Sequence, residues 1–444
     1  MIKSKGDINR LGDKIRSEVG DLSESTLLDL QDYRTSHKES LAAIFRELCR
    51  VRYKVGRNTI VTYRIKRFES IINKLQRFPK MDFSRMWDIG GCRCIVNSDS
   101  EVYKLKDEID KTLNIKKVND WIEKPQSDGY KSLHLYVNLP DDNRTIEIQI
   151  RNQNDHNWAT LVEISDLLFD SGLKEYGRNT DLLRFHKLLS KRRELTISDK
   201  KEVAKISKKY QYINKIGDVF VRNHLNVREQ WLKIETKSRH KYFLIETSKS
   251  EIPKIDAFDN FDDAEKSYFA KFKNNQKANI VLTHLPKPNY NQISIAYSNY
   301  MLTMHSFIDE SAFIFESLII ESLKKGHYFD FFKFFDYYQN IVINRLTNSV
   351  REIVYSQNLT NKESKSLNRK FSKKGKEWEQ DIKKDFSASK RKIESFNKIF
   401  KEHLPQKGIK RSVVKRIMKY VFWKQKRRLK KLATTTYIKN APNR

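Results

Sequence analysis

Two short alternating runs of residues constrain this chain most, because each run carries an acidic residue at a fixed place. Asp88 precedes an alternating run at 92–96, and Glu147 lies inside a second run at 146–150. Alternation with a period of two predicts strands with one buried face. Two strands of one sheet would bring both carboxylates together at its edge. Paired carboxylates among Arg and Lys residues suit a magnesium–nucleotide site, where acids hold the cation and bases hold phosphates.

Four motifs in a fixed order include these acids. They are Arg64-x-Lys66-x-x-x-Ser70-x-x-x-Lys74, Asp88-x-x-Gly91-x-Arg93, Gly129-Tyr130-x-Ser132-Leu133-His134 and Glu147-x-Gln149-x-Arg151. Together they resemble the synthetase domain of the RelA/SpoT family over about residues 52–169. The resemblance implies a Mg2+-dependent enzyme that transfers pyrophosphate from ATP to a ribose 3′-hydroxyl.

The resemblance also implies a role for each residue of these motifs. Asp88 and Glu147 would be catalytic and hold magnesium, although Glu147 could instead accept the proton of the hydroxyl. The residues that would bind ATP are Arg64, Lys66, Ser70, Lys74 and Arg93. The residues that would line the acceptor site are Tyr130, His134, Gln149 and Arg151. Guanidinium groups suit stacking on adenine, ammonium groups suit phosphate, and a tyrosine ring suits stacking on the acceptor base.

The residue patterns alone leave simpler interpretations open. Lys66, Ser70 and Lys74 are spaced four apart on a helix predicted over about residues 66–76, and charged residues at this spacing usually form a solvated face. Asp88 before two glycines suits a turn. The order of all four motifs, rather than any one of them, therefore carries the functional interpretation.

Three positions depart from the usual RelA/SpoT pattern, which has Tyr, Lys and Thr where this chain has Trp121, Gln126 and Asn152. The missing lysine removes a phosphate contact from the acceptor loop, and a free guanine nucleotide would miss that contact more than an RNA end would. We therefore expect the 3′ end of tRNA as acceptor. The alternative is GDP or GTP, giving (p)ppGpp. A second alternative is a non-catalytic regulator that binds nucleotide or RNA.

A tyrosine pair follows a predicted small unit at 200–305. Tyr297-x-x-Tyr300 is a weak motif by itself, and two half-buried tyrosines at a domain edge would explain it. In this position the chain resembles the CapRel type of fused toxin–antitoxin. The resemblance implies that both tyrosines are autoinhibitory plugs of the ATP cleft, released by a phage trigger protein, and that the toxin modifies tRNA and stops translation in anti-phage defence.

The charge of the chain is unevenly distributed. The net charge of +32 divides into +3 over residues 1–180, +8 over 181–310 and +21 over 311–444. The basicity therefore indicates a partner of the C-terminal part rather than the chemistry of the motifs. A basic amphipathic helix near 410–424 predicts contact with RNA, with an anionic membrane surface or a partner helix as alternatives.

We expect an α+β fold in three parts. Residues 1–199 would form a RelA/SpoT nucleotidyltransferase-like mixed sheet flanked by helices, 200–305 a small α/β control domain, and 306–444 a helical basic extension. The aromatic block at 329–338 is expected to be core, with an exposed docking patch as the alternative. The sequence shows no transmembrane segment, and buried free thiols at Cys92 and Cys94 indicate a reducing, cytoplasmic location.

Overall fold

The computed structural model describes residues 4–169 apart from 19, 57 and 141, then 179–216, 227, 230, 231, 234, 240–247, 253–274, 279–285, 288, 290–296, 304–343, 409–439 and, with gaps, 380–404. The chain forms two compact units. The first combines Met1–Ser165 with Asn226–Thr303, and the second combines Asp166–Leu225 with Met304–Arg444. Each unit is described by itself below.

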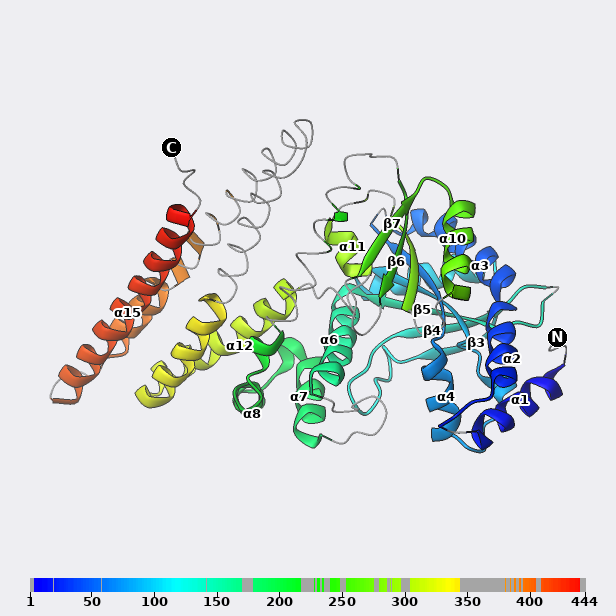
Figure 1. Ribbon diagram of the computed structural model, residues 1–444. Coiled ribbons are helices and arrows are strands. Elements are labelled where there is room, and N and C mark those ends of the chain that lie inside the picture. Colours follow the sequence, from blue (N-terminus) through cyan, green and yellow to red (C-terminus); the bar gives the residue numbers. More distant parts are fainter. Residues whose placement is uncertain are drawn as a thin grey trace. The chain divides into compact units, whose positions relative to one another are not determined.

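A mixed sheet forms the centre of the first unit (Figure 1). Its eight described strands follow the order β3-β4-β5-β2-β1-β8-β6-β7. β2 and β5 are parallel, and the other neighbouring pairs are antiparallel. The strands are β1 (Ile60–Ile65), β2 (Gly90–Val96), β3 (Asn114–Asp120), β4 (Leu133–Asn138), β5 (Ile146–Asn152), β6 (Tyr242–Thr247), β7 (Lys254–Phe258) and β8 (Asn279–His284). The expected α+β class with a mixed sheet is confirmed.

The helices of the first unit begin where the sequence supplies capping side chains. The Ser23 hydroxyl accepts from the Thr26 amide, and the Ser98 hydroxyl accepts from the Glu101 amide, as N-cap residues do. The apolar spacing over residues 22–53 predicts one helix, but the structure has two, because the chain turns near Ser36. The helices are α1 (Lys5–Ser17), α2 (Glu24–Thr35), α3 (Lys38–Val51), α4 (Phe68–Arg77), α5 (Asp99–Asp110), α6 (Gln153–Phe169), α10 (Phe261–Asn274) and α11 (Tyr290–Ala296), with 3-10 turns η1 (Arg52–Lys54) and η2 (Phe83–Arg85).

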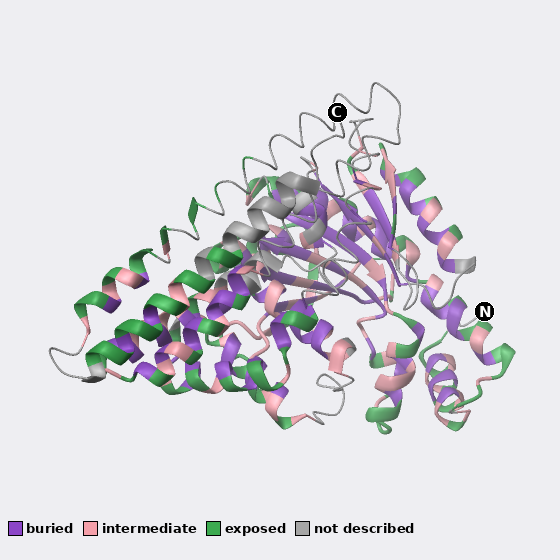
Figure 2. Ribbon diagram, turned by 60° about the vertical axis from the view of Figure 1, so that its left-hand side comes forward, coloured by how far each residue is buried: buried purple, intermediate pink, exposed green. Residues whose placement is uncertain are grey.

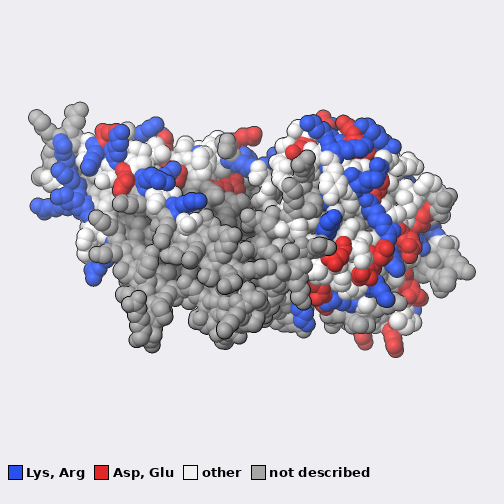
Figure 3. All heavy atoms as spheres, turned by 90° about the horizontal axis from the view of Figure 1, so that it is seen from above, with Lys and Arg blue, Asp and Glu red and all other residues white. Residues whose placement is uncertain are grey.

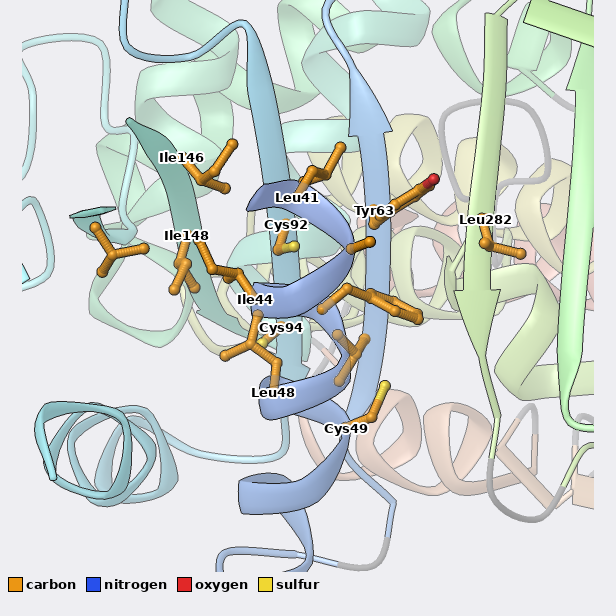
Figure 4. Packing of buried hydrophobic residues seen from close by; sticks show 14 of the residues in the cluster. Leu41, Ile44, Leu48, Cys49, Tyr63, Cys92, Cys94, Ile146, Ile148 and Leu282 are labelled. Atoms are coloured by element: carbon orange, nitrogen blue, oxygen red, sulfur yellow. The ribbon is translucent and has the colours of Figure 1, made fainter. Parts of the chain in front are cut away.

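One face of the sheet packs against α3, α5 and α10 and forms the main core (Figure 4). Leu41, Ile44 and Leu48 lie on one side of α3, at the spacing of a helix face. They meet strand residues that alternate along β2 and β5, including Cys92 and Ile148. Each buried aliphatic side chain of this kind contributes about 1.5–3 kcal/mol. Cys92 and Cys94 are buried free thiols on this face, as expected.

β8 joins the later segment directly to the motif-bearing sheet. Val61 pairs with His284 and Tyr63 with Leu282, and the Thr283 hydroxyl donates to the Val61 carbonyl at 3.0 Å. The three-part division expected at 200 and 306 therefore differs from the structure, in which β6, β7 and β8 extend the first sheet. Figure 2 shows the central strands of this sheet largely buried. Because residues 166–225 belong to the second unit, the chain leaves the first unit and returns to it.

The second unit is helical in its described residues. Its helices are α7 (Thr180–Ser190), α8 (Ile197–Lys209), α12 (Met304–Lys324), residues 328–343 and α15 (Ile409–Lys439), with the 3-10 turn η3 (Arg192–Glu194). Phe331, Phe335 and Tyr338 of the aromatic block are buried, whereas Phe329 is 93% exposed. Most of this block is therefore core. No helix among the described residues is long and apolar enough to cross a membrane.

Candidate active site

The polar positions of four strands face away from the main core and lie in two rows. In the first row, β1, β2, β5 and β4 place Arg64, Gly91, Glu147 and Tyr136 side by side. In the second row they place Thr62, Arg93, Gln149 and His134 side by side. Side chains alternate between the faces of a strand, so the same alternation that buries Cys92 and Ile148 on one face gathers these groups on the other.

Both acidic residues of the sequence prediction line one pocket. Asp88 lies two residues before β2, and Glu147 lies on β5, which is the parallel neighbour of β2. The lining residues are Thr62, Arg64, Lys66, Asp88, Gly91, Cys92, Arg93, Glu147, Gln149, Asn279, Val281 and Ala296. The sheet thus brings together two carboxylates and three cationic side chains that are far apart in the sequence.

Asp88 is held between two ammonium groups. Its carboxylate accepts from Lys66 Nζ at 2.7 Å and from Lys74 Nζ at 3.1 Å. Burial by itself would raise the pKa of Asp88, but the two ammonium groups outweigh burial and hold that pKa well below its usual range. Burial also lowers the pKa of Lys66, and the Asp88 carboxylate opposes this change. Asp88 is therefore an anion beside two ammonium groups of the kind that bind phosphate.

Glu147 is 7% exposed, and three side chains surround its carboxylate. Tyr136 Oη donates to Oε1 at 3.0 Å and Gln149 Nε2 donates to Oε2 at 2.7 Å. His134 Nδ1 lies 3.0 Å from Oε1. Burial favours the neutral acid, but the contacts from His134 and Gln149 favour the anion and lower the pKa of Glu147 overall. The site thus keeps this buried acid ionised and fixed in one orientation.

A further row of groups continues from Glu147 toward the loop at 125–130. His134 Nε2 lies 2.8 Å from Tyr130 Oη, and Arg151 donates to the same hydroxyl. The Arg151 guanidinium also lies over the Tyr130 ring, 4.7 Å from its centre. The Tyr130 amide donates to Asp128 Oδ1 at 2.9 Å, and Gly129 completes the turn with a φ of +95° that favours glycine. The loop therefore holds the Tyr130 ring in place.

Arg93 lies between the two halves of the pocket. It donates to Gln149 Oε1 at 3.4 Å, and Arg151 donates to the same oxygen at 3.2 Å. Burial, together with the nearby positive charges of Arg151 and Arg64, lowers the pKa of Arg93 to about 9. Such a concentration of positive charge in a pocket is stabilised by an anionic ligand.

The later part of the chain supplies one wall of the pocket. Asn279 and Val281 come from β8, and Ala296 is the last residue of α11. His156 on α6 fixes this wall, since its Nε2 lies 2.9 Å from the Ile295 carbonyl. Burial lowers the pKa of His156 to about 3, so the ring is neutral. His156 therefore acts here as a structural contact.

Most of the residues named from the sequence come together in this structure, and two details differ from the prediction. Lys66 precedes α4 instead of lying on it, because residues 60–65 form the strand β1 and the helix begins at Phe68. Ser70 is half-buried on α4 and is not among the pocket-lining residues. Tyr297 and Tyr300 lie outside the described residues.

Sequence reasoning missed several residues that line the pocket or contact its acids. Tyr136 is two positions after His134 on β4, so strand alternation could have placed it on the same face. Thr62 shares a face with Arg64 for the same reason. Asn279 and Val281 carried no local signal, because they reach the pocket only through the pairing of β8 with β1.

Comparison with known proteins supports this description. Residues 63–168 match the family model described as the region found in RelA / SpoT proteins. GTP pyrophosphokinase YwaC of Bacillus subtilis is 38% identical over 111 residues, covering 22% of this chain and 53% of that protein. Guanosine-3′,5′-bis(diphosphate) 3′-pyrophosphohydrolase of Borreliella burgdorferi is 34% identical over 103 residues, covering 22% of this chain and 15% of that protein. This chain thus spans about half the length of the first relative and less of the second.

Two solved structures are similar to less than half of this chain. Small alarmone synthetase 1 from Bacillus subtilis, bound to its product pppGpp, has a TM-score of 0.32 and 19% identity, covering 40% of this chain and 95% of its own. A GTP pyrophosphokinase family protein from Streptococcus pneumoniae has a TM-score of 0.32 and 21% identity, covering 43% of this chain and 98% of its own.

The fold and the site define an α+β protein with a pocket of mixed charge on the open face of its sheet. Within this protein, residues 63–168 resemble the region found in RelA / SpoT proteins, which is about a quarter of the chain.

Proposed function

We propose that this protein is an ATP pyrophosphokinase, which transfers the β,γ-diphosphate of ATP to a ribose 3′-hydroxyl. One observation carries the proposal. Asp88 and Glu147 line the same pocket as Arg64, Lys66 and Arg93. Cations of this kind bind a nucleotide triphosphate, and paired carboxylates complete a site for phosphoryl-type transfer. The name of the Bacillus relative, GTP pyrophosphokinase, agrees with this reaction class.

The donor set fits the magnesium ion that such a reaction uses. Asp88 and Glu147 are carboxylates with lowered pKa values, and Mg2+ is usually held by one or two carboxylates together with substrate phosphates. No larger His, Cys, Asp and Glu cluster that could hold a metal occurs among the described residues. When bound, Mg2+ would neutralise part of the negative charge of the phosphates.

The reaction assigns work to the pocket side chains themselves. The acceptor oxygen forms a bond to the β-phosphorus of ATP, the bond between that phosphorus and the α,β-bridging oxygen breaks, and AMP leaves. In this proposal Lys66 and Lys74 hold the phosphates, while Arg64 and Arg93 hold the adenine. Glu147 is positioned either to accept the hydroxyl proton or to hold the metal. His134, Gln149, Arg151 and Tyr130 form the acceptor side.

Two acceptors have separate support. The departure from the family pattern at Gln126 favours the 3′ end of tRNA over a free nucleotide. The name of the Bacillus relative favours GTP, with (p)ppGpp as product. We retain the tRNA end as the leading acceptor and the guanine nucleotide as the second candidate.

The test is incubation with ATP labelled in its γ-phosphate and with tRNA, GDP or GTP as acceptor. Label on tRNA supports the leading acceptor, and label only on the small nucleotide overturns it in favour of the second candidate. Glu147→Gln is the matched control for label transfer. Absence of transfer to every acceptor, including with Tyr297→Ala, would favour a non-catalytic nucleotide- or RNA-binding regulator.

We further propose that Tyr297 and Tyr300 block the ATP side of the pocket as part of an autoinhibited toxin, which a phage trigger protein would release. The support is the position of Ala296, which lines the pocket and directly precedes Tyr297. The expected result for Tyr297→Ala is tighter ATP binding and toxicity on expression. Unchanged ATP affinity together with harmless expression would overturn this proposal.

A further inference from the structure

α15 differs from the rest of the described chain in its charge. The helix runs from Ile409 to Lys439 and contains no Asp or Glu. In its part from 411 to 428, the basic side chains with a described exposure are all exposed. These residues are Arg411, Lys415, Arg416, Lys419, Lys424, Arg427 and Arg428. Figure 3 shows Lys and Arg gathered at the left of the view, where α15 begins.

One narrow side of α15 packs into the second unit. Val414 and Met418 are 6% and 2% exposed, and they are four residues apart, so they lie on the same helix face. The Phe422 ring lies 5.3 Å from the ring of Phe335, which is a buried residue of the helix at 328–343. This side therefore holds α15 in the fold.

A second apolar stripe on α15 faces solvent. Val413, Ile417, Tyr420 and Trp423 are 48%, 41%, 58% and 55% exposed. At about 100° per residue, Tyr420 and Trp423 lie a third of a turn or more from both Val414 and Met418, and Val413 and Ile417 lie between the two sides. Packing of the unit therefore does not account for it, and large exposed apolar groups in one stripe indicate an interaction surface.

The aromatic members of the stripe are surrounded by cations. The rings of Tyr420 and Trp423 lie 6.0 Å apart with 30° between their planes. The Arg427 guanidinium lies over the Trp423 ring, 5.3 Å from its centre. At helical spacing, Arg416 and Lys424 lie on the same side as these rings. Exposed π faces thus alternate with positive charge along about three helical turns.

We propose that this face of α15 binds single-stranded nucleic acid. Its bases would stack on Tyr420 and Trp423, and its phosphates would contact the neighbouring Arg and Lys side chains. Proteins hold single strands with aromatic rings on a basic surface. Each base has a ring that can stack on them, and each phosphate has a negative charge that the basic side chains can contact. In a duplex the bases are stacked on one another, so their ring faces cannot stack on Tyr420 and Trp423. This face of α15 is therefore expected to prefer single strands.

The arrangement fits a nucleic acid better than a lipid surface. A helix that lies in a membrane needs one broad apolar face and a separate polar face. On α15 the apolar side formed by Val414, Met418 and Phe422 already packs inside the unit, and cations interrupt the exposed stripe. The proposal uses none of the pocket residues, so it is independent of the proposed pyrophosphokinase function.

The test measures fluorescence anisotropy of labelled oligouridine and oligothymidine with the full-length protein. We expect binding that weakens with salt and a loss of about tenfold for Trp423→Ala and for Tyr420→Ala, because one stacked base is worth about 1–3 kcal/mol. Trp423→Phe should keep most of the affinity. The matched control is Phe329→Ala, which removes an exposed ring elsewhere in the second unit. Preference for oligouridine over oligothymidine would assign the natural strand to RNA.

Three results would overturn the proposal. One is an affinity that Trp423→Ala and Tyr420→Ala leave unchanged while circular dichroism shows the same helix content. Another is tighter binding of duplex than of single strand. The third is binding of phosphatidylserine vesicles, lost in Trp423→Ala, in the absence of oligonucleotide binding.

Discussion

Glu147 lies directly beside Gly91 in the parallel pairing of β2 and β5. The strand position next to the buried carboxylate therefore has no side chain, and the pocket extends over it. A Cβ at Gly91 would meet its nearest neighbour, the Glu147 carbonyl oxygen, at 3.5 Å, which is an ordinary contact. At Gly90 a Cβ would lie 2.7 Å from Ile146 Cδ1 on the core face.

These adjacent glycines give opposite predictions. Gly91→Val should weaken ATP binding by tenfold or more while changing the melting temperature little, because its side chain fills the pocket. Gly90→Ala should instead destabilise the fold by about 1–3 kcal/mol, as overpacking of a core does. Titration calorimetry and thermal unfolding of both variants check this. A Gly91→Val protein with normal ATP affinity would contradict the assigned site.

The hydrogen bond from Tyr136 to Glu147 predicts a change in the pH profile. Tyr136→Phe removes a donor to the carboxylate, which should lower activity about tenfold and raise the pKa of Glu147. The acid limb of the kcat profile then moves to higher pH. Tyr63→Phe is the matched control, because that buried hydroxyl has no hydrogen-bond partner among the described residues and lies on the core face. An equal effect of both substitutions would argue for a general loss of packing.

The ion pairs of Asp88 predict how stability depends on pH. The pKa of Asp88 is lower in the folded chain, so its contribution is present above the unfolded pKa and is lost as the pH falls toward the folded value. Asp88→Asn should therefore lower the free energy of unfolding by about 1–3 kcal/mol at pH 7. Its stability should also decrease less steeply than that of the wild type below about pH 4. Urea unfolding across this range measures both, and parallel curves would contradict the prediction.

Substitutions on the two sides of the pocket should raise the KM values of different substrates. Arg64 lines the pocket beside Lys66 and Asp88, whereas Arg151 donates a hydrogen bond to Tyr130 Oη. Arg64→Ala should raise the KM for ATP about tenfold through the loss of stacking on adenine. Arg151→Ala should raise the KM for the acceptor about tenfold through the loss of one charge-assisted hydrogen bond. Steady-state kinetics with one substrate varied at a time measures this. If both variants raise the KM for the same substrate, the assignment of the two sides is wrong.

Local pattern accounts for much of the site, and long-range pairing accounts for what was missed. Alternation and the order of the motifs predict Asp88, Glu147 and Arg93 on one sheet. β1 is not among the predicted strands, and the helix predicted from about residue 66 begins only at Phe68. Periodicity contains no information about which strand pairs with which, so the place of β8 beside β1 had no signal in the sequence.

The pairing of β8 with β1 joins groups 222 positions apart in the sequence, as the bond from Thr283 to Val61 shows. While the ribosome is still making the intervening residues, β1 has a bare edge and the nucleotide pocket lacks the wall that Asn279 and Val281 form. A chain that is cut short before β8 would therefore expose an edge open to aggregation. Completion of the pocket is in this way tied to nearly complete synthesis of the first unit.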